Sequence, residues 1–137
     1  MSTPISNSTS YISPAEFLKR YDARTVGDLC GDLNSRVTPT ALLTDPNLQA
    51  VLSDGAGMIE QACLVGNRYL PTDLVALTGV SQASLYRLNA DLAIGMLYQR
   101  RPDLGPVPEQ YGMAMSMLAA LEAGTLIFGL QETMDAG

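Results

Sequence analysis

The hydrophobic residues of this chain recur at the three- and four-residue spacing of amphipathic helices. Three segments carry the longest apolar stripes, over residues 46–65, 81–100 and 108–123. The pattern predicts three long helices that pack by these faces. Met115 lies outside the last stripe, so we expect it to face a neighbouring surface. The stripes consist, in chain order, of Leu48, Val51, Leu52, Ile59, Ala62 and Cys63, then Leu85, Leu88, Leu92, Ala93, Met96 and Leu97, then Met113, Met117, Leu118 and Leu121.

Helix-capping residues indicate where these helices, and shorter ones, begin and end. Ser13 and Glu16 flank Pro14 in a capping box, which predicts a first helix from residue 13. A short helical turn over 25–30 and a loop over 31–45 follow. The remaining signals are Asp45 before Pro46, Thr72 as the cap of a short helix that ends at Gly79, Ser81 as the cap of the longest helix, and Gly31, Gly66, Asn67 and Gly124 as helix ends.

Two glycines, Gly55 and Gly57, lie inside the helix predicted over residues 46–65. Each costs a helix about 1 kcal/mol relative to alanine. One interpretation is that these small residues let another backbone approach closely. The other is that the helix breaks over residues 54–57.

Together these elements predict an all-α fold, a small bundle of about five helices over residues 13–124. A flexible N-terminal arm over 1–12 and a flexible C-terminal tail over 125–137 flank the bundle. The apolar segment T-L-I-F-G-L at the start of the tail is β-prone and predicts a short β-segment near the C-terminus. A chain of 137 residues is one domain by length and can bury about two-thirds of its unfolded surface.

Charge argues against binding to polyanions. Eight Lys and Arg residues face fourteen Asp and Glu residues, for a net charge of −6. Such a chain would be repelled by nucleic acid and by anionic membranes. We expect no membrane partner, because no 18-residue apolar run is present, and no ordinary signal peptide, because the first residues lack a basic segment followed by an apolar one.

The composition offers little for catalysis or metal binding. The chain contains no histidine, its acids are scattered, and no phosphate-binding glycine loop or nucleophile elbow occurs. We therefore expect a protein that is not an enzyme, with no catalytic residues, no cofactor and no metal. Cys30 and Cys63 are too few for a disulfide framework or a zinc site, and we expect two reduced, partly buried thiols.

Residues 71–90 have the packing pattern of a helix-turn-helix, with Gly79 at the turn. The second helix of such a motif must read base edges, and here only Gln82 could do so well. Arg87 is the one basic residue of the segment. A DNA-binding regulator that uses residues 71–90 is therefore the alternative function, and a generic helical interaction module is a third.

Five sequence segments, taken in order, resemble those of a known family. They are Y-I-S-P-A-E-F-L-K-R-Y-D-A-R-T-V-G-D-L, L-L-T-D-P-N-L-Q-A-V-L-S-D-G-A-G-M-I-E-Q-A, G-N-R-Y-L-P-T-D-L, D-L-A-I-G-M-L-Y-Q-R-R-P and L-A-A-L-E-A-G-T-L-I-F. By their order and spacing over about residues 11–128, the chain resembles the head–tail adaptor (connector or head-completion) proteins of tailed bacteriophages and phage-like particles. The resemblance implies an all-α virion protein that forms a homo-oligomeric ring, commonly a dodecamer, on the portal protein at the capsid vertex. Such a ring extends the DNA channel, lets the genome pass without sequence-specific binding, and docks the next neck or tail-completion protein. It assembles in the bacterial host cytoplasm and carries no catalytic residues.

Apolar residues in the two tails are the candidate docking sites for the portal or a neighbouring subunit. Ile127, Phe128 and Leu130 lie beyond the last predicted helix and suit strand addition to a partner. Tyr11 and Ile12 are the second candidates. Other conspicuous residues have simpler explanations: we expect Tyr69 to pack beside the bundle, Arg68 to pair with an acid, and Arg100 and Arg101 to form a solvated helix end.

Overall fold

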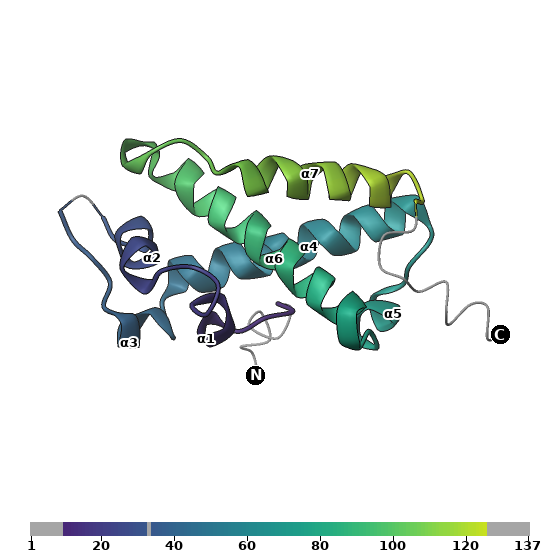
Figure 1. The fold of residues 1–137 in the computed structure, drawn as a ribbon, viewed down its shortest axis with the longest axis horizontal. Coiled ribbons are helices and arrows are strands. Elements are labelled where there is room, and N and C mark those ends of the chain that lie inside the picture. Colours follow the sequence, from purple (N-terminus) through teal and green to yellow (C-terminus); the bar gives the residue numbers. More distant parts are fainter. Residues whose placement is uncertain (1–9, 33, 126–137) are drawn as a thin grey trace.

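The structure is a computed structural model that describes residues 10–32 and 34–125, and the regular elements of these ranges are all helical (Figure 1). This confirms the predicted all-α fold. No strand occurs in the described ranges, and residues 126–130, where a β-segment was predicted, lie outside them. In chain order the elements are α1 (Pro14–Phe17), α2 (Ala23–Cys30), α3 (Pro39–Leu42), α4 (Pro46–Gly66), α5 (Pro71–Val75), α6 (Gly79–Arg100), the short 3₁₀ helix η2 (Pro102–Leu104) and α7 (Glu109–Glu122).

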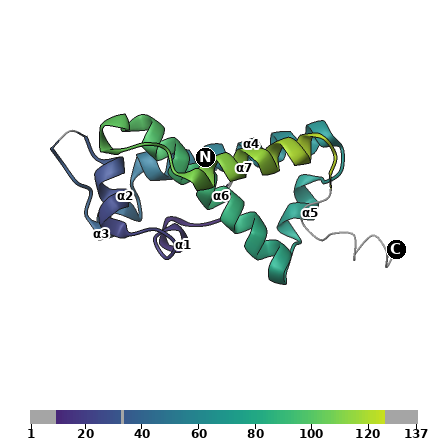
Figure 2. The same ribbon diagram turned by 45° about the horizontal axis from the view of Figure 1, so that its top comes forward.

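The three long helices α4, α6 and α7 form the centre of the molecule. In Figures 1 and 2, α4 and α7 run side by side in the same direction, and α6 runs back across both. The helices α1, α2 and α3 gather around the start of α4, and α5 lies at the other end of the molecule. Two buried clusters result. One joins α4, α5, α6 and α7 around Ile59, Leu88 and Leu121, and the other joins α1, α2 and α3 to α4 and α6 around Phe17, Leu29 and Leu48.

Several predicted helix ends are confirmed in atomic detail. Ser13 and Glu16 form the reciprocal capping box, and the Asp45 carboxylate accepts from the backbone N–H of Leu48 at 3.0 Å. After α7, Gly124 adopts a left-handed φ of +80°, and the next backbone N–H, of Thr125, reaches back to the carbonyl of Ala120 at 2.9 Å. This bond belongs to a Schellman motif, in which carbonyl groups that lack helical partners accept from backbone N–H groups just beyond the helix end.

Other boundaries differ from the prediction. The loop predicted over 31–45 contains α3, because the Thr38 side chain accepts from the backbone N–H of Ala41 and Pro39 begins the turn. Helix α5 begins after Leu70 rather than Thr72. The backbone N–H of Leu70 donates to the Asp73 carboxylate at 2.8 Å, a contact that fixes the first turn.

The start of α6 was also wrongly placed. Gly79 is the first residue of α6, with Thr78 as its cap, and it does not end α5, which stops at Val75. Gly79 has a φ of +59°, a conformation that glycine adopts without a side-chain clash. The chain therefore turns between Val75 and Gly79. The glycine that was predicted to end α5 instead begins α6.

Burial along α6 is broader than a single stripe predicts. Residues 88–95 are all buried, including the polar Asn89 and Asp91, because α6 crosses between the two core clusters. In α7 the correction concerns one residue: Met113 is 60% exposed, and Ala114 takes its place in the core. Met115 is 40% exposed and Met117 is half-buried.

The two glycines of α4 play different parts, and the helix does not break at either. A Cβ atom on Gly55 would lie 2.9 Å from the amide nitrogen of Asn89 and 3.4 Å from the Leu92 side chain, so the close approach of α6 requires the glycine. A Cβ atom on Gly57 would have no neighbour within 4 Å. The predicted close approach is confirmed within the chain for Gly55 only.

Candidate interaction surfaces

The N-terminal docking candidates lie against the chain's own helices. Ile12 is 2% exposed and belongs to the cluster around Phe17 and Leu48. The backbone N–H of Tyr11 donates to the Asn89 side-chain oxygen at 3.0 Å, and the Tyr11 hydroxyl donates to Glu60 at 3.0 Å. Residues 10–12 therefore contact the bundle, although they were assigned to the arm, and this packing does not favour Tyr11 and Ile12 as docking residues. The other candidates, Ile127, Phe128 and Leu130, lie outside the described residues.

A small cavity of about 360 Å³ lies between residues 10–11, α4, α5 and α6. Glu60 and Tyr11 line it together with Gln82 and Tyr86. Burial, and then the charge of Glu60, raise the pKa of the Tyr11 phenol well above its usual range. The phenol is therefore neutral at physiological pH and serves as a donor to the carboxylate.

Residues 71–90, which have the packing pattern of a helix-turn-helix, pack as expected, but Gln82 and Arg87 contact groups of the same chain. Leu74, Leu85 and Leu88 are buried, as the packing half of such a motif requires. Gln82, the one candidate base-reading residue, donates from Nε2 to the Leu77 carbonyl at 3.2 Å. Arg87 lies 3.6 Å from Asp91, one turn later. The first turn of α6 presents Val80, which is 84% exposed. The first turn of α6 carries no basic residue.

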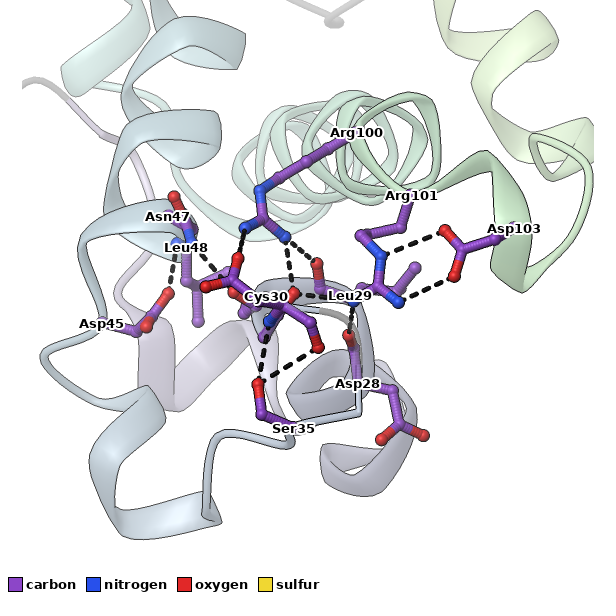
Figure 3. A network of polar contacts seen from close by, with 12 residues as sticks. Asp28, Leu29, Cys30, Ser35, Asp45, Asn47, Leu48, Arg100, Arg101 and Asp103 are labelled. Carbon is purple, nitrogen blue, oxygen red and sulfur yellow. Dashed lines mark hydrogen bonds and ion pairs between the residues drawn. The ribbon is translucent and has the colours of Figure 1, made fainter.

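Arg100 and Arg101 do not form a simple solvated helix end. Figure 3 shows both guanidinium groups directed at the last turn of α2, and Asn47, from the first turn of α4, approaches the same turn. Between them, these side chains donate to every backbone carbonyl from residue 28 to residue 31, the groups that a helix C-terminus leaves without partners. The donor–acceptor distances are 3.0 Å from Arg101 to Asp28, 2.6 Å from Arg100 to Leu29, 2.8 Å from Asn47 to Cys30, and 3.0 and 2.7 Å from Arg100 and Arg101 to Gly31.

Arg68 and Tyr69 join α4 to α7 and α5. Tyr69 is buried in the cluster around Ile59 and Leu88, which confirms that it packs with the bundle. Among the described residues Arg68 forms no ion pair, and it donates from Nε to the Gly124 carbonyl at 3.1 Å. A cation at the end of α7 also interacts favourably with the helix dipole. Both residues therefore have structural roles at the ends of helices.

The two cysteine thiols are buried and free, and their pKa values lie well above physiological pH. Burial, followed by the nearby Asp45 carboxylate, raises the pKa of Cys30 to about 12. Burial and the charge of Glu60 raise the pKa of Cys63 to about 11. Among the described residues, no three His, Cys, Asp or Glu side chains gather where they could hold a metal ion. Within the same ranges, no helix is long and apolar enough to cross a membrane.

Several exposed apolar side chains belong to elements at the end of the molecule that carries α5 (Figure 1). They come from the last turns of α4, from α5 and its preceding loop, and from the first turn of α6. Val75 is 71% exposed and Val80 84%, and the other three each expose more than half of their surface. We call this the α5-end surface, and it consists of Leu64, Val65, Leu70, Val75 and Val80.

A second surface is the open groove of about 650 Å³ along α4 and α7. Its lining includes the apolar residues Met58, Met115 and Leu118 and the carboxylates of Asp54 and Glu122. The sequence pattern did not predict this groove. The exposed methionine Met115 and the unexplained Gly57, which also lines it, were the available signals.

Comparisons with known proteins do not place the chain in a family. No protein-family model, no curated protein and no solved structure matches it.

Proposed function

We propose that this chain is a structural virion protein, a head–tail adaptor that forms a ring beneath the portal of a tailed phage or phage-like particle. The ring extends the DNA channel and docks the next neck or tail component. The sequence resemblance supplies this specific identity. The features of the described residues that support it are an exposed apolar surface, a second groove, and basic side chains that are mostly occupied within the chain.

The α5-end surface carries most of the argument. Single exposed apolar residues are ordinary in a folded protein, but several on neighbouring elements at one end of a molecule favour contact with a partner. Here five aliphatic side chains from three successive elements are exposed at one end of the bundle. The described residues end at Thr125, just after α7, where Gly66 of α4 is packed against Leu121 and Gly124. Ile127, Phe128 and Leu130 remain the docking residues that we propose for the tail.

The distribution of basic residues fits a protein through which DNA passes without being held. Four arginines form ion pairs with carboxylates of the same chain, and Arg68 donates to a backbone carbonyl. These pairs offset part of the positive charge that would neutralise phosphates, which is the term that dominates DNA affinity. A net charge of −6 would further weaken attraction to the genome. The ion-paired residues are Arg36, Arg87, Arg100 and Arg101.

The experiment is quantitative mass spectrometry of nuclease-treated, density-purified particles from the organism that encodes the chain. We expect the chain at about the copy number of the portal protein. Its absence from such particles would contradict the adaptor function. A parallel titration of purified protein against duplex DNA tests the alternative. A regulator that uses residues 71–90 would bind with an affinity that falls steeply as salt increases, whereas an adaptor would leave the DNA unbound.

A further inference from the structure

The groove between α4 and α7 contains a glycine that the fold of the described residues does not need. Gly57 is exposed, lies within α4 and lines the groove, and a Cβ atom there would meet nothing within 4 Å. Glycine weakens a helix interior, so alanine would be the better residue for the helix alone. Two other helical glycines are explained by their neighbours, since Gly66 and Gly95 would clash with Leu121 and Tyr111 if they carried a Cβ atom, whereas Gly112 of α7 would meet nothing. Unlike Gly112, Gly57 lines the groove, and its missing side chain leaves that space empty.

The groove combines apolar and acidic groups. Met58, Met115 and Leu118 supply the apolar lining, and Asp54 and Glu122 add two exposed carboxylates from the two helices. An occupant that matches both features has a long aliphatic stem and a positively charged end. Lysine and arginine side chains have this chemistry.

The same chain offers such side chains on the opposite side of the molecule. Lys19, Arg20 and Arg24 are exposed, lie between the end of α1 and the first turn of α2, and form no ion pair among the described residues. We call these three residues the basic corner. The nearest acids along the chain are already engaged, since Glu16 belongs to the capping box of α1 and Asp22 accepts from the backbone N–H of Thr25 at 3.0 Å.

We propose that the groove between α4 and α7 of one copy receives the basic corner of the next copy. Figure 1 shows α1 and α7 on opposite sides of α4 and α6, so one copy can make both contacts at once. An interface between two different surfaces repeats from copy to copy and closes into a ring when the rotation allows it. This inference rests on the proposed ring-forming function and names the contact that joins neighbouring subunits. The carboxylates of Asp54 and Glu122 pair with the basic corner, and the aliphatic stems cover Met58 and Met115.

The composition of the chain provides a sharp test, because Lys19 is its only lysine. A carbodiimide joins an amine directly to a carboxylate that it touches, without a spacer. We would treat a concentrated mixture of ¹⁴N- and ¹⁵N-labelled full-length protein and identify mixed-isotope peptides by mass spectrometry. The expected products join Lys19 of one copy to Asp54 or Glu122 of another. Lys19→Arg keeps the charge but removes the amine, so it should form the same oligomers while losing these products.

Three further variants test the groove and its contact with the basic corner. Gly57→Trp should fill the groove and abolish the mixed-isotope products, while a melting temperature at or above that of the wild type shows that the helix is intact. Reversing the charge of the groove alone (Asp54→Arg with Glu122→Arg) should weaken self-association roughly ten-fold or more. Reversing the charge of the basic corner in the same protein (Lys19→Glu, Arg20→Glu and Arg24→Glu) should restore self-association.

Three results would overturn the proposal: mixed-isotope links from Lys19 to other carboxylates, a complete lack of mixed-isotope links at high concentration, or unchanged links in Gly57→Trp. None of them would affect the copy number of the chain in purified particles. Failure of this contact is therefore distinguishable from failure of the adaptor function.

Discussion

The guanidinium of Arg100, near the end of α6, donates from Nη1 to the carbonyl oxygen of Leu29 at 2.6 Å, across 71 residues of sequence (Figure 3). The same nitrogen donates to the Gly31 carbonyl at 3.0 Å. Both acceptors are buried at the C-terminus of α2, where carbonyls lack helical partners and the helix dipole favours a cation. The last turn of the longest helix thus fixes the position of α2 and, through it, of the basic corner.

Replacing Arg100 with alanine should destabilise the fold by about 1–3 kcal/mol, because buried carbonyls would lose a charged donor. Arg100→Lys should recover part of the loss, since an ammonium retains the charge but lacks the planar fork of donors. Urea unfolding followed by circular dichroism measures both. Arg36→Ala is a suitable control, because Arg36 and Asp28 form an exposed ion pair, and pairs of this kind contribute little to stability. Equal effects at Arg100 and Arg36 would contradict the assigned role.

Local signals in the sequence were sufficient for much of the fold. Ser13, Asp45 and Gly124 act on backbone groups within a few residues, so their caps could be predicted without knowledge of tertiary structure. The partners of Arg100 could not be predicted in this way, because they belong to an element about seventy residues away. A pair of arginines at a helix end matches a solvated terminus equally well by pattern alone.

The sites of interaction were harder to predict for a related reason. Periodicity separates one buried face from one exposed face, but α6 contacts neighbours almost all round, and Asn89 and Asp91 are buried within it. Exposure at Met113, and the empty space beside Gly57, depend on how α7 is rotated against α4. Two helices with similar apolar content can adopt several such rotations, and single-helix patterns do not choose among them.

Asn89 should hold the N-terminal segment against the bundle. This side chain is fully buried, donates from Nδ2 to the Leu52 carbonyl at 3.0 Å, and accepts from the backbone N–H of Tyr11 at 3.0 Å. Asn89→Ala leaves the Tyr11 N–H without this acceptor and opens a small void, so we expect a loss of about 1–3 kcal/mol. Hydrogen exchange at residues 11 and 12 should accelerate more than exchange at the end of α7. Unchanged protection of the Tyr11 amide would show that other contacts hold the segment.

The buried thiols should make the protein less stable in alkaline solution. The pKa values of Cys30 and Cys63 rise from an ordinary 9.0 to about 12 and about 11, because burial disfavours the thiolate in the folded state. The unfolded chain loses these protons near pH 9 and the folded chain only at higher pH, so their contribution to stability is complete below pH 9. It declines as the pH rises toward the folded values.

Urea unfolding between pH 8 and 10 measures this decline. Tyrosines, whose ordinary pKa is 10.0, begin to ionise toward the top of this range, so a variant without the thiols is needed to separate the two effects. The variant Cys30→Ala with Cys63→Ala should be less stable at pH 8 but should lose less stability between pH 8 and 10 than the wild type. In the same range, a thiol-alkylating reagent should modify the unfolded chain rapidly and the native chain slowly. Rapid modification of either native thiol at pH 8 would contradict the burial that raises both pKa values.

Gly57 and Gly66 of α4 should respond in opposite directions to the same substitution. A Cβ atom on Gly66 would lie 1.8 Å from the Leu121 carbonyl oxygen and 3.0 Å from its carbon, and these backbone atoms cannot move aside without shifting the end of α7. Gly66→Ala should therefore destabilise the protein by about 1–3 kcal/mol, as overpacking does. Gly57→Ala meets no neighbour and should stabilise it by up to about 1 kcal/mol through better helix propensity. Thermal unfolding of both variants measures the difference.

Because both substitutions are made in one helix, helix propensity favours alanine at each position, and only the approach of α7 separates the two variants. A stabilised Gly66→Ala variant would mean that α7 does not contact α4 at this point in solution.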